Sequence, residues 1–288
     1  MKHINPIHGS IRKSPSSILY VFLAYIVFAF VLIISIFPFI WVLLSSFKSN
    51  REILSSAFAL PAKITFDGYR IAMKQANIPM RFFTSLIVAS SATIISILFY
   101  SMAAYVLARF DFKLKNYVYG LLICSMLVPT NAILQPIYSI VRTLGLYDTK
   151  GALILVYSGF GMALTLFLLK GYFQNIPKEL DEAAIIDGAG FVTVFLRIML
   201  PLAKPAFVSA GILTFIACWN ELLYALMLTS SERSRTLPLT MMYFTNMFSF
   251  NYTAMLAAIV ICILPTILVY ILLQEQIMES MVAGSIKG

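Results

Sequence analysis

Few side chains in this chain of 288 residues have the types and spacing that a catalytic or metal site requires. The two histidines, His3 and His8, lie near the N-terminus, and the three cysteines, Cys124, Cys218 and Cys262, lie far apart inside apolar runs. Neither a Ser–His–Asp set nor a His/Cys metal cluster fits this spacing, and the GxxxxGK[ST] pattern of a phosphate-binding loop is absent. We therefore expect no catalytic residue, no metal site and no cofactor bound by this chain, which we predict is not an enzyme.

Glu221 is the one acidic residue inside a long apolar run. A charge in hydrocarbon is costly unless it faces water, a partner or a polar cavity. Glu221 could line such a cavity together with its neighbours Trp219, Asn220 and Tyr224, or it could tie two helices together. The residues leave both interpretations open. Two amides of an earlier apolar run are weaker candidates for the same cavity: Asn131 and Gln135.

A stretch of acidic and small residues lies between two apolar runs and predicts a short helix over about 177–187. Asn175 suits the N-cap and Pro177 the first turn, while Gly188 suits a left-handed end. Four residues at helical spacing predict one small apolar side that admits another backbone closely: Leu180, Ala183, Ala184 and Gly188. A helix this short cannot span a bilayer.

A second amphipathic stretch follows over about 191–200. Its expected apolar side consists of Phe191, Phe195, Ile198 and Met199. Pro201 and Pro205 are expected to break it. Together the two stretches predict a helix-turn-helix along the membrane surface, and packing on headgroups or on the chain's own helices is the alternative.

The composition requires that these segments be carried by a membrane protein. Hydrophobic residues make up 60% of the chain, charged residues 11%, and the mean hydropathy is +0.90. These values exclude a soluble globular domain and a disordered chain. Six apolar stretches are long enough to cross a bilayer: Ile18–Leu44, Phe82–Leu107, Tyr117–Tyr138, Ala152–Tyr172, Ala206–Leu228 and Tyr252–Leu273.

The predicted fold is therefore an all-α integral membrane protein with six transmembrane helices. We expect an N-terminal tail at 1–17, one membrane domain at 18–273 that includes the segment 173–205, and a C-terminal tail at 274–288. The net charge of +9 fits anionic lipid, and no soluble basic module points to nucleic acid. Basic residues flank both sides nearly evenly, so they do not set the orientation.

The short acidic stretch carries a motif. Glu182-Ala183-Ala184, then Gly188, then Ile198-Met199-Leu200-Pro201 resembles the EAA signature of permease subunits of ABC importers. Three further segments resemble the second permease of carbohydrate importers of the maltose type: Arg109-Phe110, Trp219-Asn220-Glu221 and the terminal Ala283–Gly288.

This resemblance implies a coupling helix-turn-helix on the cytoplasmic side, and hence a multi-pass protein of the cytoplasmic membrane with both termini inside. The residues implied in contact with the ATP-binding subunit are Glu182, Ala183, Ala184, Asp187, Gly188, Ala189 and Gly190. ATP and Mg would be bound by that separate subunit. The implied partners are two ATP-binding subunits, a second homologous permease in a heterodimer, an extracellular solute-binding protein and a carbohydrate.

The resemblance also implies a role for the residues around Glu221 in binding the transported sugar. Asn220 and Tyr224 would hydrogen-bond sugar hydroxyls and Trp219 would stack on a sugar face. A polyol phosphate, peptide or amino acid is the alternative cargo. A secondary transporter would favour several intramembrane ionisable residues and two related halves, and an intramembrane hydrolase would need paired catalytic residues, so both are disfavoured.

With both termini inside, the segment 229–251 faces outward. Arg233 and Arg235 are candidates for docking the binding protein, as rim charges. The aromatics that follow are expected to close the outer end of the cavity: Tyr243, Phe244, Phe248 and Phe250. The alternative is that 239–250 forms an amphipathic helix in the headgroups.

Overall fold

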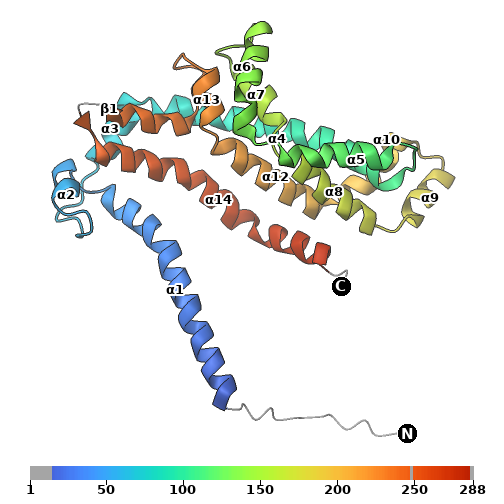
Figure 1. Ribbon diagram of the computed structural model, residues 1–288, viewed down its shortest axis with the longest axis horizontal. Coiled ribbons are helices and arrows are strands. Elements are labelled where there is room, and N and C mark those ends of the chain that lie inside the picture. The colour runs from blue at the N-terminus through green and yellow to red at the C-terminus, as the bar shows by residue number, and fades with distance from the viewer. Residues whose placement is uncertain (1–14, 247–248, 286–288) are drawn as a thin grey trace.

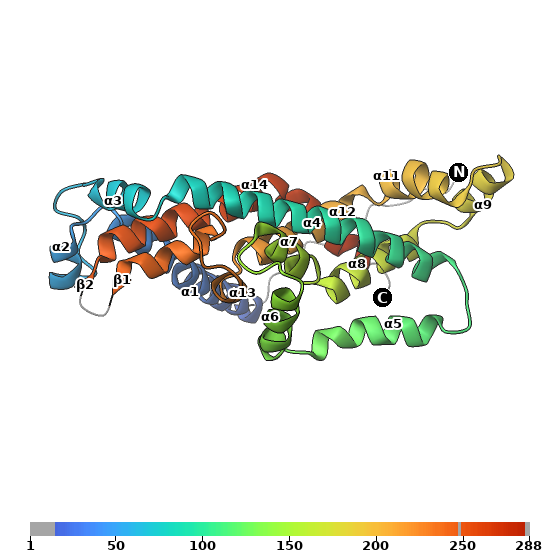
Figure 2. The same ribbon diagram turned by 90° about the horizontal axis from the view of Figure 1, so that it is seen from above.

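The computed structural model describes residues 15–246 and 249–285, and in this part the chain is almost entirely helical. It forms a long, narrow bundle with α9 at one end and α2, β1 and β2 at the other (Figures 1 and 2). The longer α-helices are α1 (Pro15–Ser45), α4 (Ile78–Arg109), α5 (Lys115–Cys124), α6 (Leu134–Thr143), α8 (Met162–Asn175), α12 (Lys204–Trp219) and α14 (Tyr252–Ser285).

Short elements join these helices. The short α-helices are α2 (Asn50–Ser55), α3 (Asp67–Gln75), α7 (Lys150–Ser158), α9 (Glu179–Ile186), α10 (Phe191–Val194), α11 (Leu200–Leu202) and α13 (Leu223–Leu228). The 3₁₀ segments are η1 (Ser125–Leu127), η2 (Thr130–Ile133) and η4 (Leu237–Phe244), and η3 (Phe195–Met199) is a π-helical turn. In β1 (Thr245–Asn246) and β2 (Ser249–Phe250), Thr245 lies opposite Phe250.

In the part of the chain that the structure describes, three helices are each long and apolar enough to cross a membrane: Leu19–Ser45, Ile78–Arg109 and Tyr252–Glu275. Three further apolar segments are bent pairs. Lys115–Leu127 and Thr130–Thr143 meet at 93°, Lys150–Ser158 and Met162–Asn175 at 49°, and Phe191–Leu202 and Lys204–Trp219 at 80°. The all-helical membrane fold expected from the composition is confirmed.

The third, fourth and fifth spans expected from hydropathy are each divided. The third is broken where Val128 is extended before Pro129, because the residue before a proline disfavours helix. The fourth is interrupted at Gly161, which has a left-handed backbone. The expected fifth helix, 206–228, ends at Trp219, and a separate helix begins at Leu223.

Helix α4 runs along the length of the bundle (Figure 2) and packs against α7, α8, α12 and η4. Small residues on its buried side, such as Ala89, Ala92 and Ala104, let these neighbours approach closely. Its hydroxyls also stabilise the break between α7 and α8. Ser96 Oγ and Tyr100 Oη both donate to the carbonyl oxygen of Ser158, at 2.8 and 2.7 Å, so a carbonyl left without a helical partner is satisfied.

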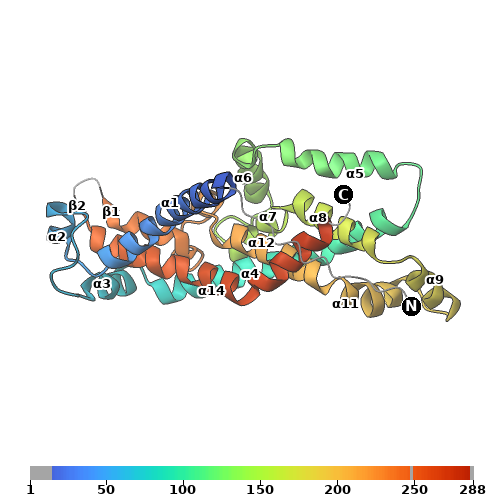
Figure 3. The same cartoon turned by 90° about the horizontal axis from the view of Figure 1, so that it is seen from below.

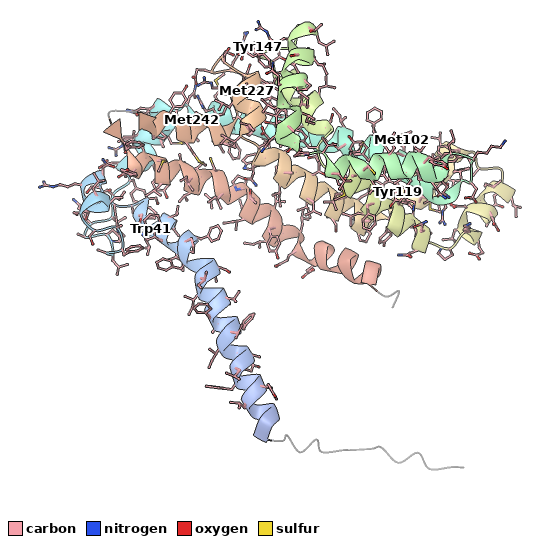
Figure 4. The ribbon with its side chains drawn as sticks, viewed as in Figure 1. Trp41, Met102, Tyr119, Tyr147, Met227 and Met242 are labelled. Carbon is pink, nitrogen blue, oxygen red and sulfur yellow. The ribbon has the colours of Figure 1, made fainter. Side chains whose placement is uncertain are left out.

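Helix α1 leaves the bundle (Figures 1 and 3), and the apolar window of its span is 0% buried. It meets the rest of the chain only near its C-terminal end, where Trp41 lies (Figure 4). There Trp41 Nε1 and Lys48 Nζ donate to the carbonyl oxygen of Ala57, at 2.9 and 3.0 Å. An apolar helix without a cover within its own chain must be covered by lipid or by another chain.

Helix α3 approaches α14 very closely at Gly68. A Cβ atom added there would lie 2.6 Å from Thr253 Cγ2 and 2.7 Å from its carbonyl oxygen. Gly120, within α5, has no atom within 4 Å of an added Cβ.

We therefore predict that Gly68→Ala lowers the stability of the purified protein by about 1–3 kcal/mol, because α3 and α14 must move apart. Gly120→Ala is the matched control and should be neutral or slightly stabilising, since alanine favours helix. Thermal unfolding in detergent measures both changes, and equal melting temperatures for the two variants would contradict the close contact.

Candidate functional site

Helix α9 lies at the end of the bundle (Figure 2). It covers Glu179–Ile186, within the range expected from the sequence. Gly188 follows with φ +84°, and the amide of Ala189 donates to the carbonyl oxygen of Ala184 at 2.9 Å. Because this left-handed position favours glycine, Gly188 ends the helix in a turn.

The faces of α9 differ from the single small side expected for this helix. Asp181 and Ala184 are buried against the bundle, whereas Glu182 and Ala183 are exposed. Leu180 is partly exposed, and no described atom lies within 4 Å of a Cβ added at Gly188. The expected stripe is therefore divided: Ala184 packs inward, and Ala183 and Gly188 face outward.

Two isoleucines form the most exposed apolar part of this helix. Ile185 is 62% exposed and Ile186 84% exposed. The sequence analysis missed both, although two adjacent β-branched aliphatic residues in a short, acidic helix were a signal. Residues of α8, α9, α11 and the α8–α9 connection line a hollow of about 310 Å³: Tyr172, Asn175, Ile176, Pro177, Leu180 and Leu202. Exposed apolar side chains such as the two isoleucines suit contact with another protein.

An ion pair fixes α9 to the bundle. Arg109, the last residue of α4, lies 2.7 Å from Asp181 through its Nε, and both side chains are almost buried. Its Nη2 donates to the carbonyl oxygen of Ile176 at 2.9 Å and lies 3.8 Å from Met199 Sδ. Burial raises the pKa of Asp181, and although Arg109 acts to lower it, the pKa stays above its usual value. One guanidinium thus joins the segments before, within and after α9.

The second half of the segment runs from Phe191 to Leu202 and bends by 80° into α12. Phe195 and Met199 are buried, as expected, but Phe191 is 42% exposed. The break expected from Pro201 and Pro205 is present, because the chain turns at Ala203, between the two prolines. Pro201 itself lies in α11, directly after the π turn, and Pro205 lies in the first turn of α12.

Glu221 lies in the break between α12 and α13, and its carboxylate accepts three hydrogen bonds. Tyr157 Oη donates to Oε2 at 2.5 Å, the amide of Tyr224 donates to Oε1 at 2.8 Å, and the amide of Ala225 donates to Oε2 at 3.0 Å. Tyr157 is fully buried. Glu221 therefore caps α13 and ties it to α7, as the structural interpretation of this residue expected.

The other residues expected along a substrate path fall into two groups. Trp219 and Tyr224 are buried; Trp219 Nε1 donates to the carbonyl oxygen of Cys262 at 3.1 Å, and Tyr224 Oη to that of Thr130 at 2.6 Å. The Trp219 ring packs between Phe82 and Phe215, so it offers no free face for stacking and its place corrects that expectation. The amides are exposed: Asn131, Gln135 and Asn220.

At the opposite end, the arginines expected to dock a partner are not equivalent. Arg233 is exposed. Arg235 is partly buried, with Nη1 3.8 Å from Glu232 and 3.4 Å from Tyr243 Oη. Glu232 also pairs with Arg81 at 2.6 Å. Although burial acts to raise the pKa of Glu232, the hydrogen bonds from Tyr243 and Arg81 and the nearby arginine charges hold it below its usual value.

The alternative of an amphipathic surface helix over 239–250 is wrong. That stretch contains part of the 3₁₀ segment η4, whose Leu237, Leu239 and Phe244 are buried between α4 and α14, followed by the β1–β2 pair. Phe250 is 46% exposed and stacks on Tyr252. Phe248 lies outside the described residues.

The residues described above are suited to binding other molecules by hydrogen bonds, charges and apolar contacts. Within residues 15–246 and 249–285, no three His, Cys, Asp or Glu side chains lie together as a metal site would need. The buried polar side chains described above, among them Arg109, Tyr157 and Trp219, bond to groups of their own chain. The features that face outward are the isoleucines of α9, the amides near Glu221, and Arg233 at the far end.

Comparisons with known proteins agree on one family. Residues 96–281 match the profile described as "Binding-protein-dependent transport system inner membrane component". The chain is 37% identical over 257 residues to the diacetylchitobiose uptake system permease protein NgcG of Streptomyces coelicolor, covering 88% of this chain and 85% of that protein. It is 32% identical over 259 residues to the trehalose/maltose transport system permease protein MalG of Thermococcus litoralis, covering 89% and 93%.

A solved structure has the same fold. It is a chain in the crystal structure of a bacterial ABC transporter involved in the import of the acidic polysaccharide alginate. The TM-score is 0.79 with 23% sequence identity, and the match covers 91% of this chain and 98% of that one.

The hydrogen bonds of Glu221 lead to a prediction about stability. Glu221→Ala removes the acceptor of the fully buried Tyr157 hydroxyl, which should cost about 1–3 kcal/mol of stability. Asn220→Ala, at the exposed neighbouring position, is the matched control and should leave the melting temperature nearly unchanged. Thermal unfolding of both variants tests this, and an unchanged melting temperature for Glu221→Ala would show that the carboxylate is not a structural tie.

Proposed function

The chain belongs to the family of binding-protein-dependent transport system inner membrane components, and we propose that it is the permease subunit of an ATP-driven carbohydrate importer. The proposal that the transported solute is a carbohydrate rests on the names of the chain's relatives. Over about nine-tenths of its length, the chain resembles permeases named for the uptake of diacetylchitobiose and of trehalose and maltose. An extracellular binding protein delivers the sugar to this permease.

In the proposed topology the chain crosses the membrane six times, with each bent pair counted as one span. At a rise of 1.5 Å per residue, the 32 residues of α4 extend about 48 Å, enough to cross the hydrocarbon and both interfaces. Both termini lie in the cytoplasm, with tails at 1–17 and 274–288 around the membrane domain 18–273. The end with α9 is then cytoplasmic, and the end with η4 and β1–β2 faces outward.

The cytoplasmic surface of α9 docks on a separate ATP-binding subunit, which holds ATP and Mg. Its exposed residues support this role: Glu182, Ala183, Ile185, Ile186, Asp187, Gly188 and Gly190. Ala184, and in part Ala189, contribute to docking indirectly, because they set the distance between α9 and the bundle. Two such ATP-binding subunits act on this chain and on a second, homologous permease.

The carbohydrate passes along the polar side chains that the fold leaves open, namely Asn131, Gln135 and Asn220. Amide groups can both donate to and accept from sugar hydroxyls. Glu221 lies directly beside Asn220 and fixes its position through α13. Trp219 and Tyr224 keep the break in shape and do not contact the sugar.

Reconstitution tests the function. The chain, its second permease, two ATP-binding subunits and the binding protein are placed in proteoliposomes, and uptake of radiolabelled trehalose, maltose and chitobiose is measured beside that of an amino acid. We expect ATP-dependent accumulation of a sugar alone. Accumulation of only the amino acid would overturn the cargo, and sugar uptake that persists without the ATP-binding subunits would overturn the class of transporter.

Docking of α9 predicts a second result. Ile186→Glu places a charge on a side chain that is 84% exposed, so folding should be little affected while an apolar contact with the ATP-binding subunit is lost. We expect that subunit to be lost from purified complexes. Leu60→Glu, at a side chain 75% exposed at the opposite end, is the matched control and should retain it. Equal recovery in both variants would contradict the docking role.

Ile186→Glu is a cleaner test than a bulky residue at Gly188. The φ of +84° at Gly188 would strain any side chain placed there. A loss of coupling in such a variant could therefore result either from backbone strain or from a blocked contact with the ATP-binding subunit.

The outer surface predicts a salt-dependent effect. Because Arg235 is held by Glu232 and Tyr243, Arg233 is the charge free to meet a binding protein. Arg233→Glu should lower the ATPase activity stimulated by the binding protein, most strongly at low salt, and leave the basal activity unchanged. Titration of the binding protein at two ionic strengths measures this. Stimulation equal to wild type under both conditions would exclude Arg233 from docking.

A further inference from the structure

Helix α4 has a buried arginine near each end, and each arginine holds a segment that faces a different partner in the proposed function. Arg81 lies in the first turn and Arg109 is the last residue. The 28 residues of separation place them about 42 Å apart along one helix. A buried arginine is costly unless it is paired. The burial of these two arginines therefore needs a structural or functional explanation.

At the outer end, Arg81 is 0% exposed and its Nη2 donates to Glu232 Oε2 at 2.6 Å. Its guanidinium also lies 4.3 Å from the centre of the Tyr243 ring. Tyr243 Oη in turn contacts Glu232. The guanidinium therefore fixes both the start of the segment 229–251 and its 3₁₀ part η4 to α4.

At the inner end, Arg109 pairs with Asp181 of α9 at 2.7 Å and donates to the carbonyl oxygen of Ile176. These contacts reach α9 through Asp181, whereas Ile186, on the other side of the helix, is 84% exposed. The docking helix therefore cannot move far along the bundle unless α4 moves with it or the ion pair breaks.

Between the two ends, α4 is one unbroken helix, while three neighbouring segments are bent. Its middle is held by Ser96 and Tyr100, which bond the carbonyl oxygen of Ser158 at the break between α7 and α8. A continuous helix of this length, pinned at its middle, transmits a shift from one end to the other better than a broken one does.

We infer that α4 is the connecting element that couples the outer docking surface to the ATP-binding subunit, with the Arg81–Glu232 and Arg109–Asp181 pairs as its two joints. This inference rests on the proposed function. It assigns both arginines as positioning residues: they contact neither the sugar nor ATP, and they act through the segments that they hold.

The experiment removes each joint without leaving a buried charge unpaired. The outer variant is Arg81→Gln with Glu232→Gln, the inner variant is Arg109→Gln with Asp181→Asn, and the third carries all four changes. ATPase activity of the complete complex in nanodiscs is measured with and without the binding protein. We expect the stimulation by the binding protein to fall roughly tenfold in each variant, within the range of ordinary coupling, with basal activity retained.

The four-change variant separates coupling from mere stability. Two joints in series form one link, so breaking the second should add nothing to the loss from the first. Independent structural effects at sites this far apart add. Equal losses in the three variants therefore support the inference, whereas full stimulation in either single-joint variant, or losses that multiply in the third, overturns it.

A control variant tests whether breaking any ion pair lowers the stimulation. Arg70→Gln with Asp67→Asn breaks an exposed ion pair, whose side chains are 71% and 68% exposed, and should leave the stimulation unchanged. If a neutral variant fails to assemble, Arg81→Lys, Arg109→Lys and their combination repeat the comparison, because lysine keeps the charge and loses the planar guanidinium. A wild-type complex that the binding protein does not stimulate would contradict the proposed function, which distinguishes that failure from a failure of this inference.

Discussion

The structure depends on one constraint, which is that backbone N–H and C=O groups inside a membrane must find partners when a helix breaks. Three apolar segments within the described residues are bent, and a further break separates α12 from α13; at two of these breaks side chains supply the missing bonds. Ser96 and Tyr100 of α4 bond the Ser158 carbonyl oxygen, and Glu221 caps α13. The unbroken helix α4 therefore stabilises the bend between α7 and α8. A bundle of bent helices leaves polar amides open, and those amides line the proposed path.

The sequence predicted the helical membrane fold because apolar runs of about 20 residues have few other solutions. It also located the short helix α9 from its caps. It did not predict the breaks in the fourth and fifth spans, because apolar content is the same on both sides of each break. Whether a chain breaks at Gly161 depends on hydroxyls about 60 residues away, such as Ser96 and Tyr100, and hydropathy carries no such information.

The candidate site was predicted in position and only partly in its chemistry. The motif around Glu182 lies on an exposed helix, but which of its alanines faces outward depends on how α9 is anchored. The anchor joins Arg109 and Asp181, which are distant in sequence, so no local pattern predicted it. The same holds for Trp219. A tryptophan beside Asn220 and Glu221 suggested sugar stacking, and the structure instead buries it under Phe82 and Phe215.

The central claim is that α4 and α9 move as one body during transport, and a distance measured between them tests it most directly. Ile94 on α4 and Glu179 on α9 are both exposed and can carry spin labels, and of the native cysteines only Cys124 is exposed and needs replacement by serine. Pulsed electron paramagnetic resonance on the complete complex, with and without trapped nucleotide, gives the distance in each state. The account predicts the same distance in both states. A shift of about 5 Å or more, one helical turn, would show that α9 slides on α4 and would contradict it.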